Sequence, residues 1–170
     1  TMTTRAVPAI PEEPTAVRHV YPPDWQGEKV KRPYRNIMEA VNGYAPICDV
    51  YITVRPGMEA KPGTVILMHG GVHTYDNQKY WHWKPKGRPA HSYWQHGTIT
   101  LNAKGTAENP IYIVPAGDGE VIIDGNGCHN LFNLRSTDYL HFEGLTIRGC
   151  DIAFHCGWQG LRGGGMKGLT

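Results

Sequence analysis

Short β-rich segments separated by turns dominate this chain from residue 50 onward, and no helical pattern interrupts them. The segments at 110–116 and 120–125 are separated only by Gly117-Asp118-Gly119, a sequence typical of a tight turn. The high content of glycine, with 21 residues, and of proline, with 13, suits many strands and turns better than a helical bundle. The sequence therefore predicts an all-β fold.

The β-rich segments also repeat. Glu-Gly-Leu-Thr at 143–146 is echoed by Lys-Gly-Leu-Thr at 167–170, a shift of 24 residues. Cys128 precedes Cys150 by 22 residues, and the same shift brings Phe132 onto Phe154. Repeats of about 20–30 residues made of strands and turns are typical of a solenoid, in which like residues of successive coils stack. A β-sandwich or jelly roll could use the same strands, but it would not favour a constant shift.

The beginning of the chain has a different character. Six prolines fall within residues 1–36, so we expect this segment to be an extended arm on the surface, with Tyr21 and Trp25 anchoring it. Residues 37–43 have the apolar spacing of a short amphipathic helix, with Asn36 placed to cap its start.

Several of these segments resemble a known family. IMEAV, PGTVILMHGGVHTY, GTAENPIYIVPAGDGEVIIDGNG and NLFNLRSTDYLHFEGLTIRG are similar to segments of the right-handed parallel β-helix proteins of the pectate-lyase-like superfamily. The resemblance implies an all-β, right-handed parallel β-helix (a solenoid) with a short N-terminal capping helix and an extended N-terminal arm. Residues 1–36 would then be the arm, and 37–170 the N-terminal coils of a β-helix that is truncated at its C-terminal end.

Size, charge and apolar content limit the functions to consider. The 170 residues suffice for one domain with a core, and the formal net charge is only +2, so any preference for anions must be local. No apolar run reaches the length of a membrane span. Residues 1–14 lack the basic start and the apolar stretch of a signal sequence, but the resemblance implies a secreted, periplasmic or cell-surface protein.

The stretch KYWHWKPKGRPAHSYWQHG at 79–97 is rich in aromatic and basic residues and has no acidic one. Aromatic faces stack on sugar rings, and basic groups bind carboxylates, so we expect this loop to hold part of an acidic polysaccharide. The candidate substrate-binding residues are Trp81, His82, Trp83, Arg88, His91, Tyr93, Trp94 and His96. The alternative is that the rings pack on the fold and the charges are solvated; nucleic acid is not the expected partner.

Other residue types give weaker signals. His69 and His73 would share a face of a strand, but spacing alone supplies no set of zinc ligands, so we predict no metal site. The carboxylates considered as catalytic groups make no convincing active site in the sequence, and the catalytic residues stay unknown; they are Asp118, Glu120, Asp124, Asp138, Glu143 and Asp151. We expect the four cysteines to be reduced, with Cys128 and Cys150 stacked.

The predicted function is that of a carbohydrate-active protein that binds or acts on an acidic polysaccharide. In a longer parent protein the preferred reaction is β-elimination by a polysaccharide lyase, with Ca²⁺ as a possible cofactor, whereas this chain alone is not expected to be catalytic. One alternative is a glycan-binding or structural surface protein without catalysis, and another is a glycoside hydrolase. An open C-terminal coil would also allow end-to-end association with another chain.

Overall fold

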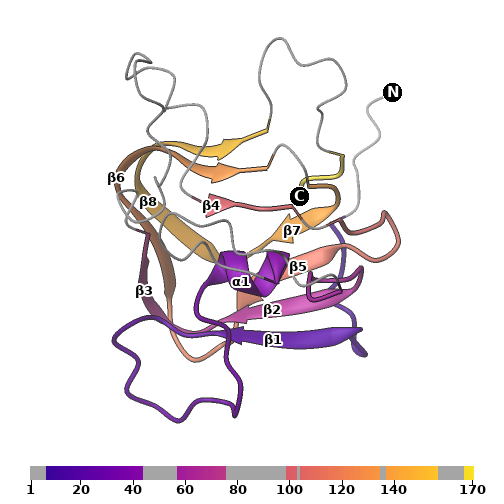
Figure 1. Cartoon of the computed structure of the whole chain (residues 1–170), viewed down its shortest axis with the longest axis horizontal. Helices are drawn as coiled ribbons and strands as arrows, with labels where there is room; N and C mark the ends of the chain where they lie inside the picture. Colours follow the sequence, from indigo (N-terminus) through magenta and orange to yellow (C-terminus); the bar gives the residue numbers. More distant parts are fainter. Residues whose placement is uncertain (1–6, 44–56, 76–98, 103, 135–136, 157–166) are drawn as a thin grey trace.

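The computed structural model describes residues 7–43, 57–75, 99–102, 104–134, 137–156 and 167–170. Its elements in chain order are β1 (Ala16–Val20), α1 (Ile37–Asn42), β2 (Thr64–Met68), β3 (Gly71–Thr74), β4 (Ile99–Thr100), β5 (Ile111–Pro115), β6 (Val121–Asn133), β7 (Leu140–Phe142) and β8 (Leu145–His155) (Figure 1).

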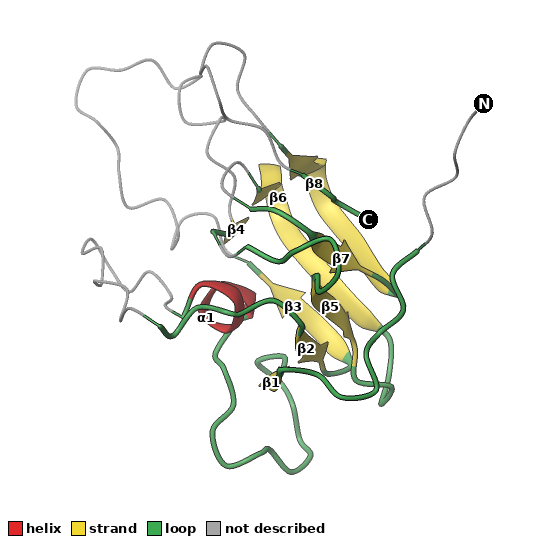
Figure 2. Cartoon of the chain, turned by 90° about the vertical axis from the view of Figure 1, so that its right-hand side faces the viewer, coloured by secondary structure: helices red, strands yellow, loops and turns green. Residues whose placement is uncertain are grey.

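Two parallel sheets of four strands each form the described part of the molecule. The first sheet, here called sheet A, has the order β1-β2-β5-β7. In the second sheet, sheet C, the long strand β6 pairs with β3 along its first part and with β4 near its end, while β8 pairs with β6 over both parts. Figure 2 shows β3, β6 and β8 side by side, so β8 lies at the outer edge of this sheet.

The core lies between the two sheets and is apolar. Its largest fully buried side chains include Ile66 and Met68 of β2, Ile113 of β5, and Ile123 and Phe132 of β6. Buried and more exposed residues alternate over 121–125 at the start of β6, as expected for a strand with one face on the core, whereas its last four residues are all buried. Burying each such side chain contributes roughly 1.5–3 kcal/mol to the free energy of unfolding.

The short helix α1 packs against this core and is capped at both ends. The Asn36 side chain accepts a hydrogen bond from the Glu39 backbone N–H, and Gly43 takes the left-handed conformation at the C-terminal end with φ 77°. Ile37 and Val41 are fully buried. The helix thus begins at the predicted residue and ends at Asn42, one residue before the predicted end at 43.

The 22-residue shift is confirmed between β6 and β8. Cys128 pairs in register with Cys150, and Phe132 pairs with Phe154 with their rings stacked 5.3 Å apart. Cys150 is a free thiol whose pKa is raised by burial and by the nearby Cys128, so no disulfide joins the two positions. Cys48 lies outside the described residues.

The predicted right-handed parallel β-helix is wrong for the described residues. Their strands form two open four-stranded sheets, with neither a solenoid nor a closed sheet. Paired residues are 22 apart at Cys128 and Cys150 but 47 apart at Val65 and Tyr112. The prediction extended to the whole chain a shift of 22–24 residues that, among the described strands, occurs only between β6 and β8.

Two further parts of that fold prediction need correction. The N-terminal segment is not merely an arm, because β1 pairs in parallel with β2 at the edge of sheet A. A strand therefore comes before α1 in the fold, and α1 is no N-terminal capping helix.

The segment 167–170 repeats the sequence of 143–146, and a 24-residue shift would pair the two segments. Thr170 instead pairs with β7. Phe142 N donates to Thr170 O at 2.9 Å, and Thr170 N donates to Leu140 O, which places Thr170 beside His141.

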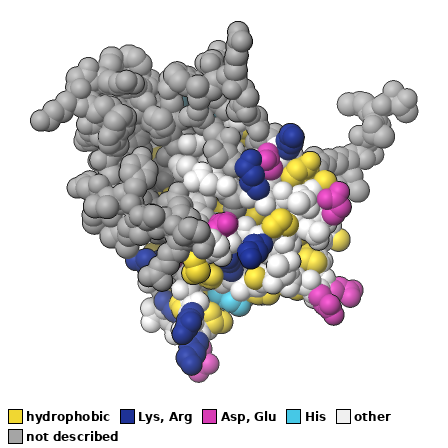
Figure 3. Space-filling view, turned by 45° about the vertical axis from the view of Figure 1, so that its right-hand side comes forward, with side chains coloured by type: hydrophobic (Ala, Val, Ile, Leu, Met, Phe, Trp, Pro, Cys, Tyr) yellow, Lys and Arg dark blue, Asp and Glu magenta, His cyan; other side chains and the backbone are white. Residues whose placement is uncertain are grey.

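Charges on the visible described surface are mixed. Figure 3 shows Lys and Arg side chains interspersed with Asp and Glu among hydrophobic ones, without a broad patch of one sign on that face. This agrees with the net charge of +2 and leaves only local sites for binding an anion. Within the described ranges, no helix has the length and apolar character needed to cross a membrane.

Candidate functional site

All eight residues predicted to bind substrate lie outside the described residues. These are Trp81, His82, Trp83, Arg88, His91, Tyr93, Trp94 and His96. The candidate site described below is built from other side chains, of which the sequence singled out only His69, His73 and Asp118 as possible functional groups.

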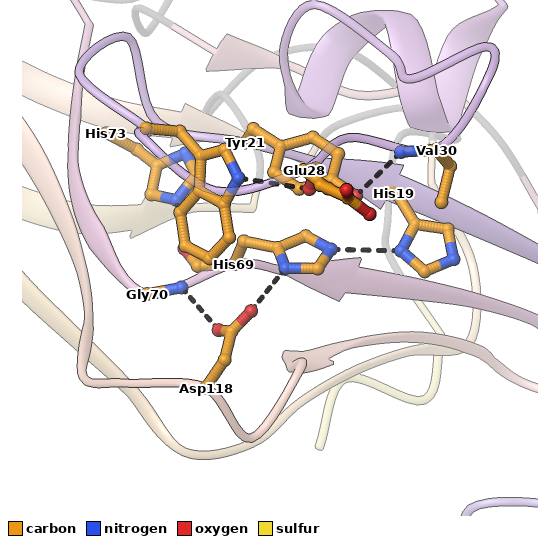
Figure 4. Close-up of polar contacts among 9 residues, drawn as sticks. His19, Tyr21, Glu28, Val30, His69, Gly70, His73 and Asp118 are labelled. Atoms are coloured by element: carbon orange, nitrogen blue, oxygen red, sulfur yellow. Dashed lines mark hydrogen bonds and ion pairs between the residues drawn. The ribbon is translucent and has the colours of Figure 1, made fainter.

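A carboxylate and two imidazoles form a hydrogen-bonded chain at one end of sheet A. Asp118 Oδ2 lies 2.5 Å from His69 Nδ1, and His69 Nε2 lies 2.9 Å from His19 Nδ1 (Figure 4). The second carboxylate oxygen, Oδ1, accepts a hydrogen bond of 2.8 Å from the Gly70 backbone N–H. We call His19, His69 and Asp118 the relay.

Parallel pairing brings the three relay residues together from distant parts of the chain. His19 lies in β1, His69 directly follows β2, and Asp118 occupies the turn between β5 and β6. Because β1, β2 and β5 pair in parallel in this order, their carboxyl ends lie together at one end of sheet A. The His69 backbone N–H also donates to Val20 O, which fixes the end of β2 against β1.

A close approach of two glycines allows the Asp118 turn to reach His69. A Cβ atom added to Gly70 would lie 2.7 Å from the Gly119 Cα, a distance that real Cβ atoms essentially never show. Glycine at position 70 therefore lets the two backbones approach, and this brings the Gly70 N–H within hydrogen-bonding distance of the carboxylate.

Aromatic rings hold His69 in place. The Tyr21 ring stacks on the imidazole with a centroid distance of 3.9 Å and an interplanar angle of 11°, and the Trp25 ring meets it edge-on at 5.2 Å. Hydrogen bonds fix the segment that follows, because Val30 N donates to the Tyr21 hydroxyl and Trp25 Nε1 donates to Glu28 O. Tyr21 and Trp25 thus anchor this segment, as the sequence predicted, by packing against His69.

The hydrogen bonds also fix where the protons lie when both imidazoles are neutral. An ionised carboxylate only accepts, so His69 carries its proton on Nδ1 and its Nε2 accepts from His19 Nδ1–H. The lone pair of the relay then emerges on His19 Nε2. Figure 4 shows this nitrogen on the side of the His19 ring away from His69.

The electrostatics favour an ionised Asp118 and a neutral His19. Burial by itself would raise the pKa of Asp118, but hydrogen bonds from Gly70 and His69 outweigh it, and the pKa is lowered. Burial, together with the nearby His69, lowers the pKa of His19 below 6.5. At neutral pH the relay can therefore accept a proton at His19 Nε2.

His73 belongs to the same region but not to the relay. The spacing had suggested that His69 and His73 share a strand, but His69 follows β2 and His73 lies in β3. His73 Nε2 lies 2.8 Å from the His69 backbone carbonyl oxygen. His73 is 3% exposed, and burial lowers its pKa. No group of three or more His, Cys, Asp or Glu suited to a metal ion occurs within the described parts of the chain.

The other carboxylates considered as catalytic groups form separate pairs, several of them exposed. Asp124 accepts from Arg148 and from the Asn126 backbone, as a turn residue would, and Asp151 pairs with the exposed His129 at 2.8 Å. Asp138 pairs with Lys104, and Glu120 accepts from Thr146. Glu143 contacts His141.

No protein-family model, curated protein or solved structure matches this chain. The resemblance to the pectate-lyase-like superfamily therefore rests on its sequence motifs alone, and the candidate function must be argued from the site itself.

Proposed function

We propose that the relay is a proton-transfer site in which His19 acts as a general base. The observation that carries this proposal is the uninterrupted chain Asp118–His69–His19, with one hydrogen bond at each junction. When His19 Nε2 accepts a proton, the Nδ1 proton of His19 can move to His69 Nε2. The positive charge then lies on His69, next to the Asp118 carboxylate, which stabilises it.

We further propose that the reaction is β-elimination on an acidic polysaccharide. His19 would remove the proton at C5 of a uronate, the electron pair would form the C4=C5 double bond, and the bond from C4 to the glycosidic oxygen would break. The departing oxygen then takes a proton from water, and the hydroxide so formed takes up the proton held by the relay, which restores neutral His19. General base catalysis of this kind contributes about 10²–10⁴-fold in rate.

Two features support an acidic sugar as the substrate. Lys29 Nζ lies 5.6 Å from the Tyr21 ring centroid, so a cation flanks the aromatic ring that stacks on His69. The aromatic and basic composition of 79–97 suits a polymer of acidic sugars. Ca²⁺ as an additional partner of the uronate carboxylate and a secreted or cell-surface location belong to the same proposal.

The test is a screen of uronate-containing polysaccharides that follows the ultraviolet absorbance of the unsaturated product. The wild-type chain should release product from at least one of them, and His19→Gln should lower the rate about 100-fold or more. His129→Gln is the matched control, because His129 also contacts a carboxylate but is exposed to solvent. Equal rates for wild type and His19→Gln would reject His19 as the base.

A glycan-binding protein without catalysis is the second candidate, and the composition of 79–97 favours it. It predicts retention of the chain on an immobilised uronate polysaccharide without product formation. Binding that is unchanged in His19→Gln, with no elimination in either protein, would support this function over the first.

We also propose association with another chain through the outer edge of β8. Among the described strands β8 pairs only with β6, and Leu145, Ile147 and Phe154 near that edge are only partly buried. Unpaired strand edges bind other strands. Sedimentation at increasing concentration should show assemblies larger than a monomer; a monomer at tens of micromolar would reject this proposal.

A further inference from the structure

A second imidazole bridges a hydroxyl and a carboxylate on sheet A, away from the relay. His141 in β7 is 2% exposed, and its Nε2 lies 3.0 Å from Glu143 Oε2. Its Nδ1 lies 3.1 Å from the Thr170 hydroxyl oxygen Oγ1. Glu143 is well exposed and Thr170 partly so, which places the hydroxyl at the boundary between the buried ring and solvent.

Strand pairing fixes these groups relative to one another. Thr170 lies beside His141, because its backbone N–H donates to Leu140 O and its carbonyl accepts from Phe142 N. On the other side, Tyr112 pairs with His141 in register, and its ring meets the imidazole edge-on at 5.5 Å. The imidazole is therefore held between two neighbouring strand segments.

The hydrogen-bond pattern assigns a direction to the protons. An ionised Glu143 only accepts, so it holds the proton of neutral His141 on Nε2 and leaves the lone pair on Nδ1. The Thr170 hydroxyl then donates to that lone pair. A hydroxyl on a base that is itself oriented by a carboxylate is the arrangement that activates a nucleophile.

We propose that Thr170, His141 and Glu143 form a second site, independent of the relay, that transfers acyl groups from carboxylic esters. Thr170 Oγ1 attacks the ester carbonyl carbon while its proton passes to His141 Nδ1. The bond from that carbon to the alkoxy oxygen breaks, and the leaving alcohol takes the proton from His141. Water, deprotonated in turn by His141, hydrolyses the acyl-threonine and restores the hydroxyl.

A second threonine of the same molecule supplies the contrast. The Thr146 hydroxyl donates directly to Glu120 Oε1 at 2.8 Å, so a carboxylate rather than an imidazole accepts its hydrogen bond. A free carboxylate is a much weaker base than imidazole, because its pKa lies near 4 rather than near 6.5. Thr146 therefore serves as the internal control for the chemistry proposed at Thr170.

The experiment uses p-nitrophenyl acetate as the ester and follows both release of nitrophenolate and acetylation of the chain by peptide mass spectrometry. Wild type should carry acetyl on Thr170 after brief exposure, and Thr170→Val should lose that modification and lower the fast phase of release about 100-fold. Thr170→Ser should keep it, because the hydroxyl is preserved. Thr146→Val should change neither readout.

Two further variants and a control connect the effect to the His141 imidazole. His141→Gln and Glu143→Gln should slow acetylation of Thr170, whereas His129→Gln, at an exposed histidine of the other sheet, should leave it unchanged. Glu143 is exposed, so its replacement keeps the proposal testable if the buried His141 variant does not fold. Absence of acetyl on Thr170, or the same rate of acetylation in Glu143→Gln, would overturn the proposal.

Discussion

Two histidine–aspartate pairs in this molecule form the same kind of imidazole–carboxylate contact but lie in very different surroundings. His69 is 12% exposed and stacks on the Tyr21 ring, and its Nε2 accepts a hydrogen bond from His19. His129 is 40% exposed, and its partner Asp151 is 75% exposed on the surface of sheet C. The imidazole–carboxylate contact itself therefore does not distinguish a functional site.

The difference between the pairs lies in what fixes the imidazole. Around His69, a stacked ring, a backbone N–H on the carboxylate and a second imidazole all restrict the geometry. Exposed ion pairs contribute only about 0–1 kcal/mol, because water screens them and side-chain entropy opposes them. The first two predictions replace equivalent groups in the two pairs, and the third concerns the buried His73 next to the relay, in order of decreasing expected effect.

The first prediction compares the two imidazoles by their effect on rate. His69→Gln should lower the rate of uronate elimination about 100-fold or more, because it interrupts the path by which positive charge reaches Asp118. His129→Gln should change the rate less than about twofold, as expected of a surface position away from the site. Initial rates at saturating substrate measure both, with circular dichroism to verify folding. Equal losses in the two variants would remove the distinction between the pairs.

The second prediction compares the two carboxylates by their effect on stability. Asp118→Asn removes a charged acceptor shared by His69 and the Gly70 N–H, and should lower the free energy of unfolding by about 1–3 kcal/mol. Asp151→Asn should change it by less than about 0.5 kcal/mol. Urea unfolding followed by tryptophan fluorescence measures both values. A larger cost at Asp151 than at Asp118 would contradict the account.

The third and smallest effect concerns pH and the buried His73. Burial lowers its pKa below the value of 6.5 expected in the unfolded chain. The unfolded state therefore binds more protons as the pH falls below about 6.5, and stability is lost over that range. His73→Gln should show a smaller loss of unfolding free energy between about pH 7.5 and pH 5.5 than wild type. The same loss in both proteins would show that another group is responsible.

Local signals in the sequence predicted local structure well. Asn36 and Gly43 delimit α1, and the 22-residue shift pairs Phe132 with Phe154, because caps and stacked like residues depend on neighbours in sequence or on a short repeat. The β-helix prediction failed where strands that pair are about 50 residues apart, as Val72 and Ile122 are. No spacing rule in the sequence specifies such a pairing.

The residues of the relay could not be brought together from the sequence for the same reason. His69 and Asp118 drew attention as residue types, but they are 49 positions apart, and only the pairing of β2 with β5 brings them together. His19 was missed altogether, because it lies in the proline-rich segment that was expected to be an arm. Its one sequence signal was the β-rich run AVRHV, which becomes β1.

The central claim, that the lone pair of the relay emerges on His19 Nε2, can be tested without knowing the substrate. Two-dimensional NMR of the ¹⁵N-labelled chain near neutral pH distinguishes the two neutral tautomers of each imidazole by the nitrogen shifts. The account predicts the Nδ1–H tautomer for both His69 and His19, since Asp118 accepts from the first and His69 accepts from the second. A proton on Nε2 of neutral His19 would contradict it.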